Sequence, residues 1–212
     1  MSLSKGRLAV LLSTLPPLQI PSVQEEQYQT DAETAAEVLS LAMLLGDITG
    51  KRVLDLGCGA GLLGLGAALL DAREVIAIER DERLIKAAES NRLLLREEAG
   101  RDLDNIRFVS QDIAAFSGRG DTVLQNPPFG TRVEHVDRAF LAKAFSVADV
   151  VWSFHKESTS GFVERFAEDS GFLVTHHLSF DFPLKATMRH HTRRIRRIGV
   201  GCWRLVRGTP VD

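Results

Sequence analysis

The 212-residue sequence has few residues that could form a disulfide framework or a metal site. Its two cysteines, Cys58 and Cys202, are far apart and have no partners at metal-ligand spacing. His155 and the pairs His176-His177 and His190-His191 likewise have no cysteine or carboxylate spaced as zinc ligands usually are. We therefore expect no metal centre, a reducing cytoplasmic location, and histidines that lie on the surface or contact nucleic acid.

Long apolar runs are also missing. Lys5 and Arg7 precede the run Leu8–Leu12, which is too short for the core of a signal peptide. Pro16-Pro17 follows this run, and no small-residue cleavage site is present. No other run is long enough to span a bilayer, so we expect no membrane partner. The sequence contains no internal repeat and no low-complexity linker, and its length is that of one domain.

The charge is unevenly distributed along the chain. The segment from Pro183 to Arg207 has eight basic residues and no acidic one, so the remainder carries a formal charge of −10 against −2 overall. An acidic body with a basic segment indicates a polyanionic partner. The eight basic residues are Lys185, Arg189, Arg193, Arg194, Arg196, Arg197, Arg204 and Arg207.

Strand and helix patterns alternate along most of the sequence. Apolar residues at helical spacing predict helices over 3–15, 32–45 and 62–70, a long helix capped by Asp81, and helices around 140–147 and 162–166. Short apolar runs predict strands at 52–56, 74–79, 106–110, 122–125, 150–154, 172–180 and 195–205. This alternation predicts an α/β fold with a mostly parallel sheet, and the last two strands should pair antiparallel because no helix separates them.

A glycine-rich turn follows the first predicted strand, with the sequence Asp55-Leu56-Gly57-Cys58-Gly59-Ala60-Gly61. Glycines let a backbone turn tightly and approach a ligand closely. The spacing is G-x-G-x-G, which differs from the G-x-G-x-x-G of dinucleotide-binding folds. Glu79 ends the next strand, where an acid can accept hydrogen bonds from both hydroxyls of a ribose. These features together predict a nucleoside cofactor.

A second turn, Asn126-Pro127-Pro128-Phe129, follows the strand at 122–125. The prolines exclude a helix and further strand pairing, so this turn is stiff. The Asn126 side-chain oxygen and the Pro127 carbonyl could each accept a hydrogen bond from one amino group, and Phe129 could stack on a base. The alternative interpretation is a rigid strand-to-helix loop without a catalytic role.

The two turns resemble motif I and motif IV of class I S-adenosylmethionine-dependent methyltransferases, which have a Rossmann-like fold. The resemblance implies that Glu79 binds the ribose and that Asp112 contacts the adenine of the cofactor, although Asp112 could instead cap a helix. With asparagine at its start, this motif IV resembles that of enzymes that methylate RNA adenine, guanine N2 of RNA or the glutamine amide of release factors. Phe129, where the release-factor enzymes usually have tyrosine, favours a base.

Three stretches together resemble the archaeal and eukaryotic methyltransferase-like family that installs N6-methyladenosine on small-subunit rRNA. They are Glu26–Thr30, Asn126–Thr131 and Ser153–Thr159. The family implies S-adenosylmethionine as cofactor and a possible small zinc-binding activator protein as partner. The implied cofactor-binding residues are Gln27, Tyr28, Thr30, Asp55, Gly57, Cys58, Gly59, Ala60, Gly61, Leu62, Glu79, Arg80, Asp112, Ile113 and Asn126, with Asn126, Pro127, Pro128 and Phe129 as the catalytic motif.

The sequence thus predicts one methyltransferase domain with three parts. Residues 1–50 would form an N-terminal helical cap, 51–154 the cofactor-binding core, and 155–212 a C-terminal half with a basic strand pair. RNA contacts are expected at Lys156, Arg189, Arg193, Arg194, Arg196 and Arg197, although these residues could also be a solvated surface. The alternatives for the whole protein are a glutamine methyltransferase that acts on a release factor and a non-catalytic RNA-binding module.

Overall fold

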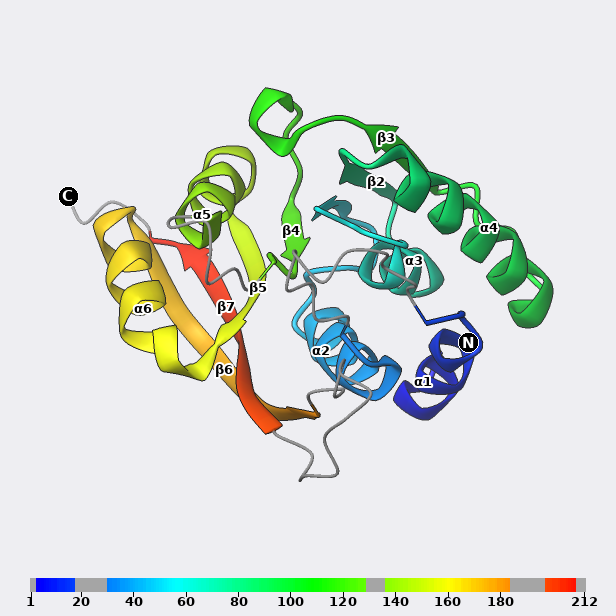
Figure 1. Cartoon of the computed structure of the whole chain (residues 1–212), viewed down its shortest axis with the longest axis horizontal. Helices are drawn as coiled ribbons and strands as arrows, with labels where there is room; N and C mark the ends of the chain where they lie inside the picture. The colour runs from blue at the N-terminus through cyan, green and yellow to red at the C-terminus, as the bar shows by residue number, and fades with distance from the viewer. Residues whose placement is uncertain (1–2, 18–29, 129–135, 184–196, 209–212) are drawn as a thin grey trace, which may run out of the picture.

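The computed structural model describes residues 3–17, 30–128, 136–183 and 197–208, and seven strands in these ranges form one sheet (Figure 1). The strand order is β3-β2-β1-β4-β5-β7-β6, and β7 runs antiparallel to the other six strands. The α/β prediction and the antiparallel last strand are confirmed. The strands are β1 (Arg52–Leu56), β2 (Glu74–Glu79), β3 (Ile106–Ser110), β4 (Thr122–Gln125), β5 (Val150–Lys156), β6 (Phe172–Pro183) and β7 (Arg197–Arg207).

Helices cover both faces of the sheet. One face packs against α1 (Lys5–Ser13), α2 (Ala32–Leu44), α3 (Leu62–Leu69) and α4 (Glu82–Ala99). The other face packs against α5 (Val136–Val147) and α6 (Ser160–Asp169). Side chains alternate along each strand, so Val53 and Trp152 enter the first core while Leu54 and Val151 enter the second. Short 3-10 turns, η1 (Ile113–Ala115) and η2 (Glu157–Thr159), follow β3 and β5.

The start of α2 is fixed by its own sequence. Asp31 has an extended backbone and caps the helix by accepting a hydrogen bond from the Thr34 N–H at 2.9 Å. The Thr34 hydroxyl also donates to the second Asp31 oxygen at 2.8 Å. Along α2 the apolar residues Ala35, Val38, Leu39 and Ala42 are all buried, so the helix packs against α1 and α3 in the core on this face of the sheet.

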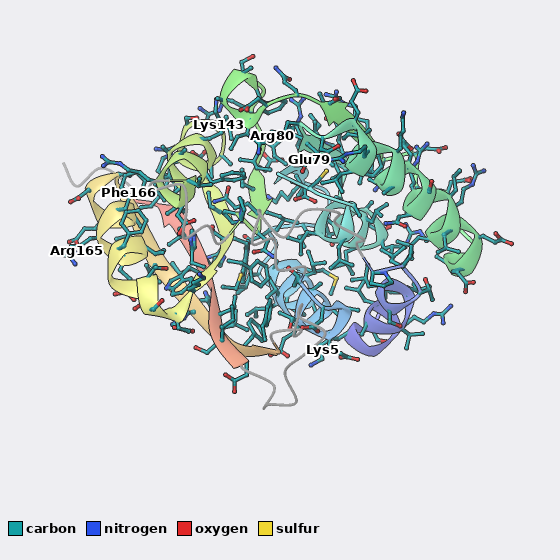
Figure 2. All side chains as sticks on the ribbon, viewed as in Figure 1. Lys5, Glu79, Arg80, Lys143, Arg165 and Phe166 are labelled. Atoms are coloured by element: carbon teal, nitrogen blue, oxygen red, sulfur yellow. The ribbon has the colours of Figure 1, made fainter. Side chains whose placement is uncertain are left out.

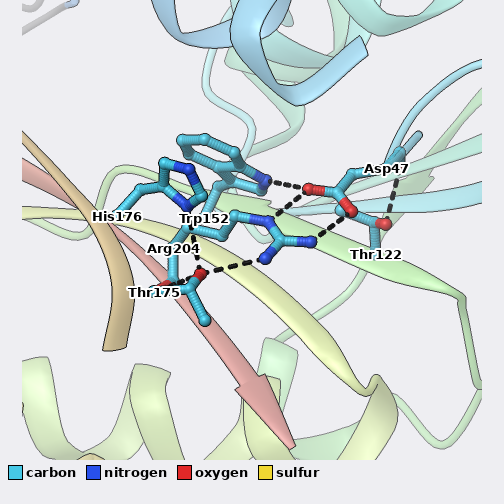
Figure 3. A network of polar contacts seen from close by, with 6 residues as sticks. All are labelled: Asp47, Thr122, Trp152, Thr175, His176 and Arg204. Atoms are coloured by element: carbon cyan, nitrogen blue, oxygen red, sulfur yellow. Dashed lines mark hydrogen bonds and ion pairs between the residues drawn. The ribbon is translucent and has the colours of Figure 1, made fainter. Parts of the chain in front are cut away.

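The other end of α2 is joined to the sheet by a buried ion pair (Figure 3). The Arg204 guanidinium donates to both oxygens of Asp47, with Nε 2.7 Å and Nη2 2.9 Å away. The Trp152 indole N–H donates to the same carboxylate at 2.9 Å, and the Thr122 hydroxyl donates to the Asp47 carbonyl at 2.6 Å. A buried charge is stable only when it is paired and hydrogen-bonded in this way. Asp47 therefore connects the loop after α2 to β4, β5 and β7.

Within the described ranges no helix is both long enough and apolar enough to cross a membrane.

Candidate active site

The two turns predicted to carry function leave the sheet side by side. β1 and β4 are parallel neighbours, with Leu56 opposite Gln125, and β1 and β2 pair with Leu56 opposite Ile78. The glycine turn, Glu79 and Asn126 therefore follow neighbouring strands at the same edge of the sheet. Ligands of open α/β sheets bind at this edge, outside the carboxyl ends of the strands.

The three glycines of the first turn are needed for different reasons. All have positive φ angles, +70° at Gly57, +55° at Gly59 and +87° at Gly61. A Cβ at Gly57 would lie 2.9 Å from the Phe140 ring, and one at Gly61 would lie 3.0 Å from the Phe108 ring. A Cβ at Gly59 would meet nothing within 4 Å. Gly59 therefore borders open space, where a ligand can approach the backbone closely.

Hydrogen bonds from neighbouring elements hold this turn in place. The Gly57 and Cys58 N–H groups both donate to the Ile78 carbonyl of β2, at 2.8 and 3.0 Å. The Asn91 side chain of α4, which is 4% exposed, donates to the Ala60 carbonyl at 2.9 Å. Asn91 was not among the predicted site residues. Its position between Ala88 and Leu95 on the buried side of α4 was a usable signal, because a polar residue there needs a partner.

Asp55 supports the turn from inside the protein. It is 1% exposed, and its Oδ2 accepts a hydrogen bond from the Gly64 N–H in α3 at 2.8 Å. Burial raises the pKa of Asp55 to about 7, the Gly64 N–H opposes this rise, and the negative charge of Glu79 adds to it. The Asp55 carboxyl group therefore takes up a proton close to neutral pH.

Cys58 is buried and is not a nucleophile. Burial raises the pKa of its thiol well above the ordinary value, and the nearby charges of Asp55 and Glu79 raise it further. The neighbouring residues of the predicted site are Ala60, which is buried, and Leu62, which is half-buried and begins α3. The thiol serves as a small packing group in a crowded turn.

Glu79 lies inward and is 7% exposed, whereas Lys5 and Arg165 lie at the periphery (Figure 2). The Glu79 Oε2 accepts a hydrogen bond from the Gly59 N–H at 3.1 Å. The Glu79 Oε1 accepts hydrogen bonds from the Arg80 and Asp81 N–H groups at 2.8 and 3.0 Å. These bonds use three of the roughly four acceptor positions of a carboxylate. One ligand hydroxyl can be added directly, and a second requires a backbone N–H to be displaced. The Arg80 side chain is exposed.

Asp112 acts as a helix cap in this structure. Its Oδ1 accepts from the Ala114 N–H at 2.8 Å at the start of η1, and the residue is exposed. This is the alternative that the sequence left open. Ile113, the next residue, is half-buried beside it. Both residues follow β3, the strand next to β2, so they lie on the same edge of the sheet as Glu79.

The proline turn contacts the chain just before α2. The Asn126 amide nitrogen donates to the Thr30 hydroxyl oxygen at 2.9 Å, although the two residues are 96 positions apart in the sequence. Thr30 is 4% exposed, Pro127 is buried and Pro128 is half-buried. The predictions for Gln27, Tyr28 and Phe129 fall outside the described residues.

Behind the turn lies a buried polar chain that the sequence analysis missed. The Gln125 amide nitrogen donates to the Ser153 hydroxyl at 2.9 Å, and this hydroxyl lies 2.6 Å from His155 Nε2. All three residues are 0% exposed, and His155 Nδ1 faces Asp137 Oδ2 across 3.9 Å. The two hydrogen bonds thus link Gln125, directly before Asn126, to Ser153 and His155 of β5. They support the strand end from which the proline turn leaves.

The prediction that His155 lies on the surface or contacts nucleic acid is wrong. β5 continues to Lys156 instead of ending at residue 154, so His155 is paired with Gly201 inside the sheet. His177 is partly exposed, stacks on Trp203 with ring centroids 4.3 Å apart, and lies 3.0 Å from Glu157. His190 and His191 lie outside the described residues.

Two arginines of the basic segment have internal partners. Arg204 is paired with Asp47, and Arg207 Nε lies 2.6 Å from Asp149. Lys156 is half-buried at the end of β5, and Arg197 begins β7. The other arginines predicted to contact RNA, Arg189, Arg193, Arg194 and Arg196, fall outside the described residues. Among the residues that the structure covers, no group of three or more His, Cys, Asp or Glu side chains could hold a metal ion.

The strand order, the glycine turn and the asparagine-proline turn at the end of β4 define a class I, Rossmann-like, S-adenosylmethionine-dependent methyltransferase. Residues 29–149 match the methyltransferase small domain, and the chain belongs to this family and, within it, to the family of METTL5. It is 33% identical over 197 residues to the rRNA N(6)-adenosine-methyltransferase METTL5 of Danio rerio, covering 90% of this chain and 91% of that protein.

Two solved structures are similar to this chain. The crystal structure of PH1948 from Pyrococcus horikoshii is similar with a TM-score of 0.83 and 38% identity, covering 97% of this chain and 98% of that one. Magnesium protoporphyrin IX methyltransferase from Synechocystis, solved with bound S-adenosylmethionine, has a TM-score of 0.65 and 19% identity, covering 83% and 79% of the two chains. The second similarity shows the fold alone.

Proposed function

We propose that this protein transfers a methyl group from S-adenosylmethionine to the exocyclic N6 of an adenosine in RNA, in particular small-subunit rRNA. One observation carries the proposal. Asn126, an amide at the start of an Asn-Pro-Pro turn, leaves β4 in register with the glycine turn that leaves β1. A methyl donor on the glycine turn and an amino group on Asn126 would therefore be neighbours. The similarity to METTL5 over nearly the whole chain supports adenosine as the acceptor.

The residues of the first turn fit this cofactor. Gly59 borders open space, and Glu79 keeps an acceptor position beside it for a ribose hydroxyl. When bound, S-adenosylmethionine supplies an electrophilic methyl group on a positively charged sulfur. The proposed binding residues are Gln27, Tyr28, Thr30, Asp55, Gly57, Cys58, Gly59, Ala60, Gly61, Leu62, Glu79, Arg80, Asp112, Ile113 and Asn126.

The second turn would make the amino group of the substrate a better nucleophile. The nitrogen lone pair of adenine N6 is delocalised into the ring, which makes it a weak nucleophile. The Asn126 Oδ1 and the Pro127 carbonyl would accept the two N–H groups and favour a pyramidal nitrogen whose lone pair faces the methyl group. As the nitrogen–carbon bond forms and the carbon–sulfur bond breaks, positive charge builds up on nitrogen, and the same two dipoles stabilise it. The proton leaves after transfer, so no strong base is required.

RNA contact is proposed at Lys156, Arg189, Arg193, Arg194, Arg196 and Arg197, where cationic side chains would neutralise phosphates. Phe129 would stack on the extruded base. We also propose a cytoplasmic location, a single domain in which residues 1–50 cap the cofactor core, and a small zinc-binding activator protein as a possible partner.

The test is methyl transfer to small ribosomal subunits that lack the modification, followed by nucleoside analysis. N6-methyladenosine is the expected product. Asn126→Ala should lower turnover by about 100-fold or more, because it removes one of two dipoles aimed at the developing charge, while the cofactor Kd measured by calorimetry stays within about threefold. Methylated guanine, or methylation of a release factor and not of RNA, would overturn the assignment. Tight RNA binding without any methylation would indicate a non-catalytic RNA-binding module.

A further inference from the structure

The contact between Thr30 and Asn126 has a role beyond packing. We propose that Thr30 is a positioning residue that holds the Asn126 amide in the orientation required for methyl transfer, an inference that rests on the proposed function of Asn126. The Asn126 nitrogen donates to Thr30 Oγ1 at 2.9 Å, and Thr30 is 4% exposed. The hydrogen bond is therefore shielded from water, where such bonds are better defined and an unmade one is more costly.

The orientation of the amide decides whether it can assist the reaction. The oxygen and nitrogen of an asparagine side chain are nearly equal in size but opposite in hydrogen-bonding character. Only the oxygen can accept a hydrogen bond from a substrate amino group. A flipped Asn126 would point its two N–H donors at the substrate amino group, which is itself a donor. In the observed arrangement the nitrogen is bonded to Thr30, so Oδ1 lies on the branch of the planar amide that points away from Thr30.

Thr30 is itself held rigidly. It directly precedes Asp31, whose side chain caps α2 through the Thr34 N–H and receives the Thr34 hydroxyl. The apolar side of α2 is buried, and the loop after the helix is fixed by the buried Asp47–Arg204 pair. The hydroxyl is thus presented from a helix anchored at both ends, which gives it the rigidity that a supporting residue of a catalytic group needs.

The family resemblance implies that Thr30 contacts the cofactor, and the geometry adds a contact to the catalytic side chain. The two roles predict different kinetics. A cofactor contact would raise the cofactor Kd when it is removed. Loss of a residue that orients Asn126 would lower the turnover number even when the cofactor is saturating.

Thr30→Val tests the proposal because valine keeps the shape of threonine and removes the hydroxyl. Because the variant loses the one hydrogen bond that orients the Asn126 amide, its turnover should be about 3- to 10-fold lower at saturating cofactor and RNA. Turnover is compared at saturating cofactor, so a rise in the cofactor Kd from loss of the proposed cofactor contact of Thr30 does not affect the comparison, and thermal unfolding followed by circular dichroism should confirm that the variant folds. Thr30→Ser, which restores the hydroxyl, should recover most of the turnover.

The side-chain amide resonances of Asn126 in a 15N-labelled sample provide a readout that does not depend on activity. In Thr30→Val these resonances should shift and their protons should exchange with solvent faster, whereas Thr30→Ser should resemble the parent protein. Unchanged resonances and turnover in Thr30→Val would overturn the proposal. A raised cofactor Kd with normal turnover at saturation would show a cofactor contact alone and would also overturn it. If the parent protein methylates a different acceptor, the proposed function fails, but the resonance test of the contact still applies.

Discussion

The raised pKa of Asp55 makes the stability of this protein depend on pH in a direction opposite to that of most carboxylates. In the folded protein the pKa is about 7, against 3.8 for an ordinary aspartate, because burial disfavours the charged form. The neutral Asp55 carboxyl group makes its full contribution to the free energy of unfolding below about pH 4, and this contribution is lost as the pH rises through 7. The difference corresponds to about 4 kcal/mol, of which about 3 kcal/mol falls between pH 5 and pH 8.

Asp55→Asn isolates this effect because asparagine cannot ionise and its oxygen can still accept from the Gly64 N–H. Urea unfolding at pH 5 and pH 8 should show the variant gaining about 3 kcal/mol relative to the parent protein at the higher pH. The exposed Asp104 offers a control, and Asp104→Asn should follow the parent at both pH values. If Asp55→Asn also follows the parent, or loses stability relative to it at pH 8, the inferred burial cost of the charge is wrong.

Two further substitutions test the supports of the site. Asp47→Ala should lower the free energy of unfolding by about 3–5 kcal/mol, because it leaves the Arg204 guanidinium buried without its counter-ion; a loss below 1 kcal/mol in denaturant unfolding would contradict the pairing seen here. Asn91→Ala should weaken cofactor binding by about 5- to 30-fold in calorimetry, because the Ala60 carbonyl loses its partner at about 1–2 kcal/mol and the glycine turn loosens; an unchanged Kd would mean that the turn is fixed without this contact.

The sheet was predictable from the sequence because its buried strands are short apolar runs bounded by glycines and charged residues. The predicted bounds of β1, β2, β3 and β4 agree with the structure. β5 and β6 extend further than predicted because their final residues are held by pairing with β7, which no local pattern reveals.

The polar supports of the site were less predictable because each depends on partners that are distant in the sequence. His155 was expected on the surface, since a histidine at a strand end usually has access to water, but Ser153 and the pairing with β7 bury it. Asp47 and Arg204 are 157 positions apart, and nothing in either local sequence indicates that they meet. Asp112 could be interpreted in two ways because a helix cap and a ligand contact both use an aspartate after a strand.

The anchoring of α2 at both ends would connect the stability of the protein with the proposed catalytic role of Asn126. With 13 residues and a rise of 1.5 Å per residue, α2 is about 20 Å long. The ion pair at Asp47 lies beyond one end of it, and the hydroxyl that contacts Asn126 precedes the other. A substitution that loosens Asp47 would let the whole helix shift, and a small shift at its far end is enough to break a 2.9 Å hydrogen bond. If Asn126 has its proposed catalytic role, a substitution at residue 47 would therefore affect turnover as well as stability.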